Sequence, residues 1–240
     1  MNKLSEIRLQ QEISTLICDY LICQNCSFID RDRDRYRRGE KCKVCGLAND
    51  AGRLAFHLNI STLVNLINEA YHSKSAIENL YRPESKNISI LILFCTLREA
   101  LINDFLLQNM RANQLPKSII YKLLDDNKMT HQKFNDLFSV ITGDKWDKAI
   151  ANISEIKSID FCDVSTLMKE ASRMRNKFLH DGSAWAIPPD YGKTCMDALP
   201  SLMALFVALH NLYTHPLIYK RLEESQSPEG NASIERNDLA

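Results

Sequence analysis

Apolar residues recur at helical spacing along most of the chain. In residues 88–110 they cover nearly every side of the first half, which predicts a helix in the middle of a bundle. Elsewhere one face is apolar and the other polar, and capping residues, Gly and Pro mark the helix ends. The patterns predict helices over residues 3–22, 59–81 with Pro83 as the stop, 116–126, 130–143, 144–150, 163–179 and 191–214 with a bend or restart at Pro200.

The helical pattern breaks at two places and so divides the chain. Residues 23–52 combine four cysteines with many charges and turn formers, and the last stretch is rich in Ser, Glu and Asn. A segment as poor in apolar residues as this last stretch cannot bury enough surface to fold alone. We therefore expect an all-α fold with a small cysteine-rich insert. Its four parts are an N-terminal helix over 1–22, the insert over 23–52, a helical bundle over 53–220 and a disordered acidic tail over 221–240.

Composition narrows the functional classes. The 240 residues carry 30 Lys+Arg and 30 Asp+Glu, and this balance gives no support for a protein that binds nucleic acid through bulk charge. The seven glycines are too scattered for a Walker A loop or a dinucleotide fingerprint. Charges interrupt the first 22 residues, and the longest apolar runs are shorter than the roughly 18 residues that span a bilayer. We expect a cytoplasmic protein without a membrane partner.

Two Cys-x2-Cys pairs predict a metal site. Cys23 and Cys26 form the first pair, Cys42 and Cys45 the second, and fifteen residues separate the pairs. In a reducing compartment this spacing is typical of a zinc ribbon, in which four thiolates hold one tetrahedral Zn2+. Gly46 after the second pair favours a tight turn. Because four thiolates leave no open coordination position, we expect a structural zinc ion and no metal in catalysis.

A row of arginines lies between the two cysteine pairs. In an extended strand Arg31, Arg33, Arg35 and Arg37 would share one face, with the neighbouring aspartates on the other. Residues 23–58 contain eight Lys/Arg against five acids. The row is a candidate for contact with an RNA backbone. Docking on an acidic protein surface and a simple solvated face are the alternatives.

The segment SRMRNKFLHDG carries a second motif. Arg175 and Asn176 are followed, after three residues, by His180. This resembles the RNxxxH signature of HEPN-superfamily ribonucleases, and Arg173 with His180 fits the looser Arg-to-His spacing of that family. The resemblance covers about residues 55–215 and leaves out the zinc ribbon. It implies a HEPN-like helical bundle, a catalytic set of Arg175, Asn176 and His180, and a homodimer that brings two motifs together, since one copy of the motif supplies one histidine.

Helix geometry singles out Arg175 independently of the family. At about 100° per residue, Arg175 falls within the apolar stripe of its helix, whereas Arg173, Asn176 and His180 fall on the opposite side. A guanidinium within such a stripe needs a partner, because burying an unpaired charge is costly. Glu99 is a candidate partner, and a phosphate held between two subunits is the alternative. A purely structural ion pair, with Asn176 and His180 as ordinary helix-end residues, is the competing interpretation.

Residues of these types can cleave RNA without a metal. A histidine can act as base or acid near neutral pH, and an arginine stays cationic and matches phosphate oxygens. The hypothesis is a metal-independent endoribonuclease that leaves 2′,3′-cyclic phosphate and 5′-hydroxyl ends. The HEPN resemblance further implies a toxin or antiviral-defence effector, and we expect a regulatory protein as its partner. The alternatives are a non-catalytic HEPN-like and zinc-ribbon module that binds RNA or a partner protein, and a zinc-ribbon regulator whose bundle only dimerises.

Overall fold

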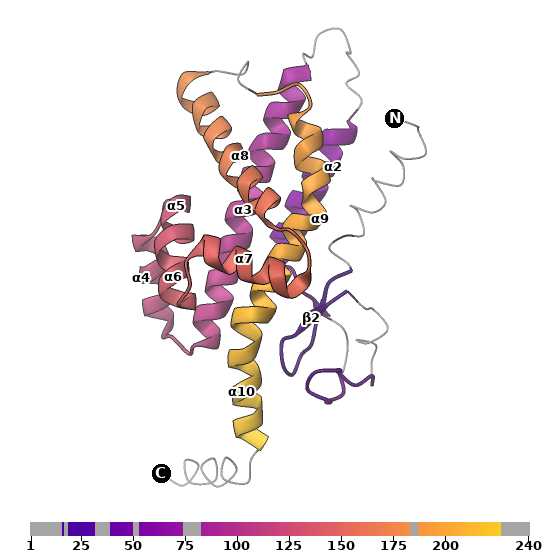
Figure 1. Cartoon of the computed structure of the whole chain (residues 1–240), viewed down its shortest axis with the longest axis vertical. Coiled ribbons are helices and arrows are strands. Elements are labelled where there is room, and N and C mark those ends of the chain that lie inside the picture. The colour runs from indigo at the N-terminus through magenta and orange to yellow at the C-terminus, as the bar shows by residue number, and fades with distance from the viewer. Residues whose placement is uncertain are drawn as a thin grey trace.

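A computed structural model describes residues 16, 19–31, 39–49, 53–73, 83–182 and 187–226, and its fold is mostly helical (Figure 1). The long helix α3 (Pro83–Ala112) lies at its centre, in contact with α2, α8 and α9. Leu91, Leu97 and Leu106 of α3 are fully buried although they spread over about half of the helix circumference. The predicted central helix is therefore confirmed. The other helices are α2 (Leu58–His72), α4 (Lys117–Asp126), α5 (Thr130–Gln132), α6 (Phe138–Thr142), α7 (Trp146–Lys157), α8 (Cys162–Asp181), α9 (Tyr191–Leu209) and α10 (His215–Gln226), with the π-helical segments η2 (Lys133–Leu137) and η4 (His210–Thr214).

Two predicted helix ends differ from the structure. The helix predicted over 59–81 ends at His72, and Pro83 is the first residue of α3 rather than a stop. A proline suits this position because the first N–H groups of a helix have no intrahelical partner. The helix predicted over 3–22 lies mostly outside the described residues, and Leu21–Ile22 form a strand instead.

The C-terminal helical rod runs further than predicted. Residues Tyr191–Gln226 are helical without interruption, and Pro200 lies inside α9 without ending it. The departure from α-helical geometry comes later, at η4. The boundary predicted for a disordered tail at residue 221 thus falls within α10, whose Leu222 packs against the cysteine-rich segment. The rest of that tail, 227–240, lies outside the described residues.

A small antiparallel sheet makes the fold not purely helical. It consists of β1 (Leu21–Ile22), β2 (Ile29–Asp30) and β3 (Arg53–Leu54), in the order β2-β1-β3. Ile22 pairs with Ile29 on one side and with Arg53 on the other. The sheet therefore brings the two ends of the cysteine-rich segment together at the base of the bundle (Figure 1).

Helices α4 to α7 form a group beside the C-terminal half of α3 (Figure 1). Aromatic contacts join this group to the core: the Trp146 ring lies 4.5 Å from Phe134 and 5.1 Å from Phe138, and Phe105 of α3 stacks on Phe138 at 5.6 Å. The Trp146 indole N–H donates to Ser165 of α8 at 3.0 Å. These contacts fix η2, α6 and α7 relative to α3 and α8.

One stretch of the described chain meets the length and composition of a membrane-spanning helix. It is Tyr191–Gln226, the rod of α9, η4 and α10. In its most apolar window 61% of the residues are buried inside the structure. Burial of this extent is the ordinary environment of a central bundle helix.

Candidate functional site: a cysteine cluster and a cationic pocket

The four predicted cysteine ligands lie together. The Sγ atoms of Cys23, Cys26, Cys42 and Cys45 are all within 4.8 Å of one another. The Sγ–Sγ distances are 3.9 Å for Cys23–Cys45 and 3.8 Å for Cys26–Cys42, far longer than a disulfide bond. A tetrahedron with metal–sulfur bonds of about 2.3 Å has edges of about 3.8 Å, which fits these separations. The cluster could therefore hold a metal ion such as zinc.

Both cysteine pairs sit in turns of the same backbone design. The Ser27 N–H donates to the Cys23 carbonyl at 2.9 Å, and the Gly46 N–H donates to the Cys42 carbonyl at 2.8 Å. Both donors have left-handed φ values, 64° for Ser27 and 72° for Gly46. Gly46 thus takes the predicted turn, and a serine fills the equivalent place in the first pair.

The second turn favours a thiolate at Cys42, although burial raises the pKa of its other thiol, that of Cys45. Burial alone would raise the pKa of the Cys42 thiol, but backbone N–H groups of Cys45 and Val44 hold that pKa below its ordinary value. The Val44 N–H lies 3.4 Å from the Cys42 sulfur. Because metal ligation requires a deprotonated sulfur, this arrangement suits a metal site.

The π-helical segment η4 anchors the cysteine-rich segment on the bundle. Asn211 accepts from the Ile29 N–H at 2.9 Å and donates to the Ile29 carbonyl at 2.8 Å. The imidazole Nε2 of the buried His210 lies 2.9 Å from the Ser27 carbonyl oxygen. Burial lowers the pKa of His210 to about 4, so the imidazole is neutral at pH 7 and its Nε2–H donates to Ser27. One helical turn therefore holds both the first cysteine turn and β2.

Only the first residue of the predicted arginine row is described. The Arg31 guanidinium lies 3.5 Å from Asp19 and over the Tyr20 ring at 5.2 Å. Arg33, Arg35 and Arg37 lie outside the described residues, so the one-sided row stays a prediction.

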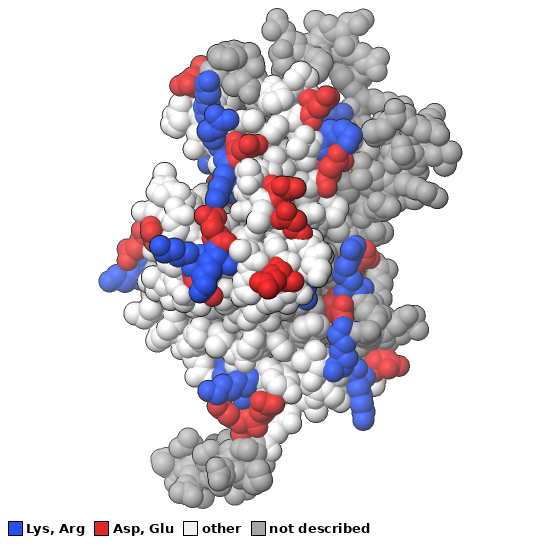
Figure 2. Space-filling view, in the orientation of Figure 1, with Lys and Arg blue, Asp and Glu red and all other residues white. Residues whose placement is uncertain are grey.

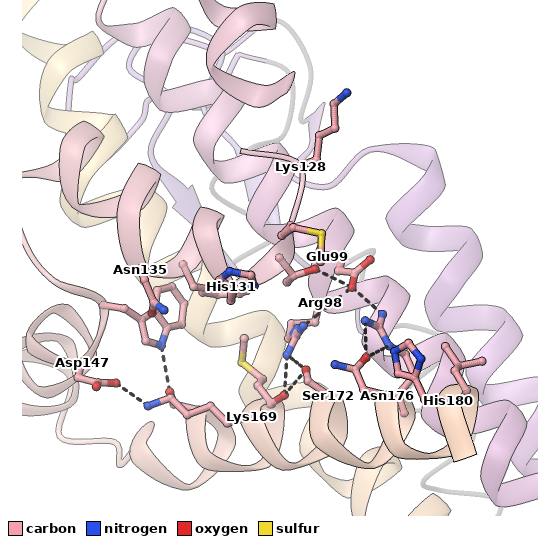
Figure 3. Close-up of a pocket in the computed structure, with 18 residues that line it drawn as sticks. Arg98, Glu99, Lys128, His131, Asn135, Asp147, Lys169, Ser172, Asn176 and His180 are labelled. Atoms are coloured by element: carbon pink, nitrogen blue, oxygen red, sulfur yellow. Dashed lines mark hydrogen bonds and ion pairs between the residues drawn. The ribbon is translucent and has the colours of Figure 1, made fainter. Parts of the chain in front are cut away.

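A pocket of about 710 Å³ lies between α3, the α5–η2 segment and α8 (Figure 3). Its charged lining is cationic, and polar amides and hydroxyls add further hydrogen-bonding groups. The side chains of α8 follow one another along one wall, and those of residues 128–135 form the opposite wall (Figure 3). The charged and imidazole side chains that line it are Arg98, Lys128, Lys169, Arg175, His131 and His180, with Glu99 and Asp147 as the acids.

Glu99 is the partner of Arg175, as expected. The Arg175 Nη1 lies 2.7 Å from Glu99 Oε1, and the Thr130 hydroxyl donates to the same oxygen at 2.8 Å. Partial burial would raise the pKa of Glu99, but the hydrogen bonds from Thr130 and Arg175 hold it below its usual value. Asn176 Oδ1 accepts from Arg175 Nη2 at 3.1 Å and Nε at 3.3 Å. Since Arg175 occupies the amide oxygen, the Asn176 NH2 group is left as a donor.

Arg98 lies behind this pair and is 5% exposed. Its Nη1 donates to the Met168 carbonyl at 2.6 Å and to the Ser172 hydroxyl, and its Nη2 lies 4.0 Å from Glu99. Its Nε is buried without a partner among the described residues. Burial lowers the pKa of Arg98, but an arginine stays charged. Two guanidiniums therefore share one carboxylate.

Three of the four polar motif residues share the pocket. Arg175, Asn176 and His180 line it together, whereas the exposed Arg173 is not part of its lining. Asn176 and His180 are exposed, off the apolar stripe as expected, and they still share the pocket with Arg175 because its side chain reaches from the stripe to Asn176.

Arg98 and His131 are among the pocket residues that the sequence-based site did not include. Arg98 directly precedes Glu99, but only Glu99 was a candidate partner of Arg175 in the sequence. The burial of Arg98 depends on the packing of α3 against α8. His131 lies in no recognisable motif. It joins the pocket only because the α5–η2 segment packs beside α3.

Comparison with known proteins gives no relative. No family model matches the chain, and no curated protein or solved structure matches it either. The structure is a mostly helical fold with a small sheet and a four-cysteine cluster compatible with a zinc ribbon. The relation to HEPN ribonucleases rests on the motif alone.

Proposed function

We propose that the chain is a metal-independent endoribonuclease of HEPN type with a structural zinc ribbon. The observation that carries this proposal is the shared pocket of Arg175, Asn176 and His180, with the buried guanidinium of Arg98 behind them. Phosphate binding requires fixed cations, and base or acid catalysis requires an accessible imidazole. The pocket offers both.

In this proposal Arg175 contacts the scissile phosphate and His180 transfers a proton. The 2′-hydroxyl loses its proton to a base and attacks phosphorus, and the 5′-oxygen leaves with a proton from an acid. The products are a 2′,3′-cyclic phosphate and a 5′-hydroxyl. Arg175 holds Asn176, whose NH2 group has no partner among the described residues, and this group donates to a phosphate oxygen or to the imidazole. Glu99 fixes the guanidinium and lies outside the reacting atoms.

The cysteine cluster has a structural part in this proposal. Cys23, Cys26, Cys42 and Cys45 would hold one zinc ion, and the closed set of sulfurs supplies stability to a segment too small to fold through its own core. The bonds of η4 to Ser27 and Ile29 would pass that stability to the bundle. Arg31 and the arginines after it are proposed to contact the RNA backbone.

We further propose a toxin or antiviral-defence role in the cytoplasm, with a homodimer and a regulatory protein partner. This part follows from the HEPN resemblance. A protein that cleaves cellular RNA needs a means of restraint, which is the reason for the regulatory partner.

A non-catalytic module that binds RNA is the second candidate. The ion pair of Arg175 with Glu99 favours it, because this carboxylate already neutralises the guanidinium and the pair alone would stabilise α8 against α3. Such a module would bind RNA in the pocket and leave it intact.

Two substitutions separate these candidates. His180→Ala and Arg175→Ala should each lower the rate of RNA cleavage by about 10²-fold or more, which is the usual contribution of a catalytic acid or base or of a phosphate-binding cation. Arg173→Ala, an exposed arginine of the same helix outside the pocket, is the matched control and should keep the rate. Cleavage that survives both pocket substitutions refutes the site. RNA binding without cleavage by the unaltered chain supports the second candidate.

A further inference from the structure

The pocket contains a second histidine from another part of the chain. His131 of α5 and His180 of α8 both line it and are both exposed, and neither imidazole has a hydrogen-bond partner among the described residues. In the view of Figure 3, Arg98 and Glu99 lie between the two rings. A reaction with two proton transfers needs a base and an acid, and two accessible imidazoles in one cationic pocket can supply both.

The residues on both sides of His131 are held in place. The Thr130 hydroxyl donates to Glu99 at 2.8 Å, and Glu99 binds Arg175. The Gln132 side chain accepts from the Met129 N–H at 3.1 Å and so caps the start of α5. The backbone that carries His131 is therefore tied to the same carboxylate that holds the motif arginine.

The positive charge around Glu99 favours the binding of an anion in the pocket. Arg98 and Arg175 share the single carboxylate of Glu99, so one positive charge is left over. Arg98 is nine-tenths buried and its Nε has no partner within the described structure. The Nε is too buried to touch a ligand, but the excess positive charge of the two guanidiniums attracts an anion, and a phosphate diester carries one negative charge. A phosphate beside Arg175, with Arg98 behind it, would lie within the pocket that both histidines line.

We propose that His131 is a second catalytic residue of this pocket and forms, with His180 of the same chain, the acid–base pair for RNA cleavage. The inference rests on the proposed ribonuclease function. One imidazole takes the proton of the 2′-hydroxyl as the 2′-oxygen–phosphorus bond forms. The other imidazolium gives its proton to the 5′-oxygen as the phosphorus–5′-oxygen bond breaks. The two rings end with one proton exchanged between them through the substrate, and no metal or other reactant is consumed.

A second histidine in the same chain would change the role of a dimer in catalysis. With one histidine per chain, two copies of His180 would have to meet at an interface. With His131 and His180 in one pocket, each chain holds a complete pair, and a dimer serves assembly or regulation but not the proton transfers.

The first test compares three histidine variants on one RNA substrate. His131→Ala and His180→Ala should each lose about 10²-fold or more in cleavage rate. His57→Ala, an exposed histidine outside the pocket, should keep the rate. Far-ultraviolet circular dichroism and thermal unfolding should match the unaltered chain, since His131 is exposed. A His131→Ala rate equal to that of His57→Ala overturns the inference and leaves the proposed function intact, whereas absence of cleavage by the unaltered chain overturns both.

A substrate with a sulfur leaving atom tests the catalytic role itself. RNA in which the 5′-oxygen at the cleavage site is replaced by sulfur needs no general acid, because a thiolate leaves readily. One of the two variants, the one that lacks the acid, should recover to within about tenfold of the unaltered chain, and the other should stay inactive. A merely structural role for His131 would leave both variants unresponsive, and that result overturns the proposal.

Mixing chains tests whether the pair lies within one copy. A fixed amount of the unaltered chain is combined with increasing excess of His180→Ala, under conditions that allow subunit exchange. The rate per unaltered chain should stay constant, because each unaltered chain keeps its own His131 and His180. A rate that falls as the excess rises shows that two copies of His180 act together and overturns the proposal.

Discussion

The carboxylate of Glu99 offsets the positive charge of the two arginines in the pocket. It accepts from Arg175 and Thr130 and lies 4.0 Å from the buried Arg98, so it offsets two cations and ties α3 to α5 and α8. Without it the folded chain would hold two neighbouring guanidiniums with no counter-charge. The pocket would then be less stable when empty and more attractive to anions.

Glu99→Gln should therefore raise the affinity for inorganic phosphate, by about threefold to tenfold, and lower the free energy of unfolding by about 1–2 kcal/mol. Isothermal titration calorimetry with phosphate and urea unfolding measure the two effects. Glu155→Gln, which removes an exposed carboxylate outside the pocket, should change neither quantity. An unchanged phosphate affinity would show that Glu99 does not face the anion site.

Residue-scale reasoning from the sequence succeeds where the chemistry is local. An arginine in an apolar stripe needs a partner, and the search for one led to Glu99. The same reasoning missed Arg98 and His131, because their place in the pocket depends on the packing of three separate elements. It placed Asn176 and His180 off the apolar stripe, where they are exposed, but could not give the contact of Arg175 with Asn176, since helix angles ignore the reach of a long side chain.

At the scale of elements, the cysteine turns and η4 form one unit. The two turns hold the four sulfurs, and Asn211 and His210 hold the first turn and β2 against the bundle. A π-helical segment within a long helix often marks a functional position. Here η4 aligns two adjacent polar side chains with the cysteine-rich segment.

The cysteine cluster gives an element-scale prediction. Cys42→Ser should reduce the zinc content from about one ion per chain to near zero and speed amide hydrogen exchange in residues 19–31 and 39–49, because the metal would hold those turns. Elemental analysis and exchange mass spectrometry measure both. Cys162→Ser, at an exposed cysteine outside the cluster, is the control. Zinc content that is unchanged in Cys42→Ser would exclude the site.

His210 makes the docking of the cysteine-rich segment sensitive to pH. Its pKa is lowered to about 4 in the folded chain by burial, so between pH 6.5 and 4 the unfolded chain binds a proton that the folded chain does not. The free energy of unfolding is therefore highest above pH 6.5 and falls as the pH drops, by up to about 3 kcal/mol from this residue. His210→Gln keeps a neutral donor for Ser27 and should make this fall shallower in urea titrations. An equal fall in His210→Gln and in the unaltered chain would contradict the assignment.

The order of the helices along the chain could largely be predicted from the sequence, whereas the strand pairs and several helix boundaries could not. The central helix and the stop at Gly143, which has a φ of 80°, follow from periodicity and from the steric freedom of glycine. The strands were missed because each has two residues and is defined by its partners, not by its own pattern. The extension of the last helix to Gln226 was missed because Leu222 gains its apolar partners from the cysteine-rich segment.

The neutral sum of charges conceals local differences in the whole molecule. Residues 167–180 carry four Lys/Arg and one acid, and they include the wall of the pocket. On the face shown in Figure 2, basic and acidic side chains lie beside one another, separated by wide uncharged areas. The described part of this face therefore offers an RNA backbone no broad basic surface.

The chemistry of the cleaved ends distinguishes metal-independent cleavage from metal-dependent hydrolysis. The unaltered chain is incubated with a defined RNA without Mg2+ or other added divalent cations, and the 3′ ends of the fragments are identified by mass spectrometry. We expect 2′,3′-cyclic phosphate ends paired with 5′-hydroxyl ends, and we expect His180→Ala to abolish both. Fragments that form only with added Mg2+, or that carry a 3′-hydroxyl and a 5′-phosphate, would contradict it.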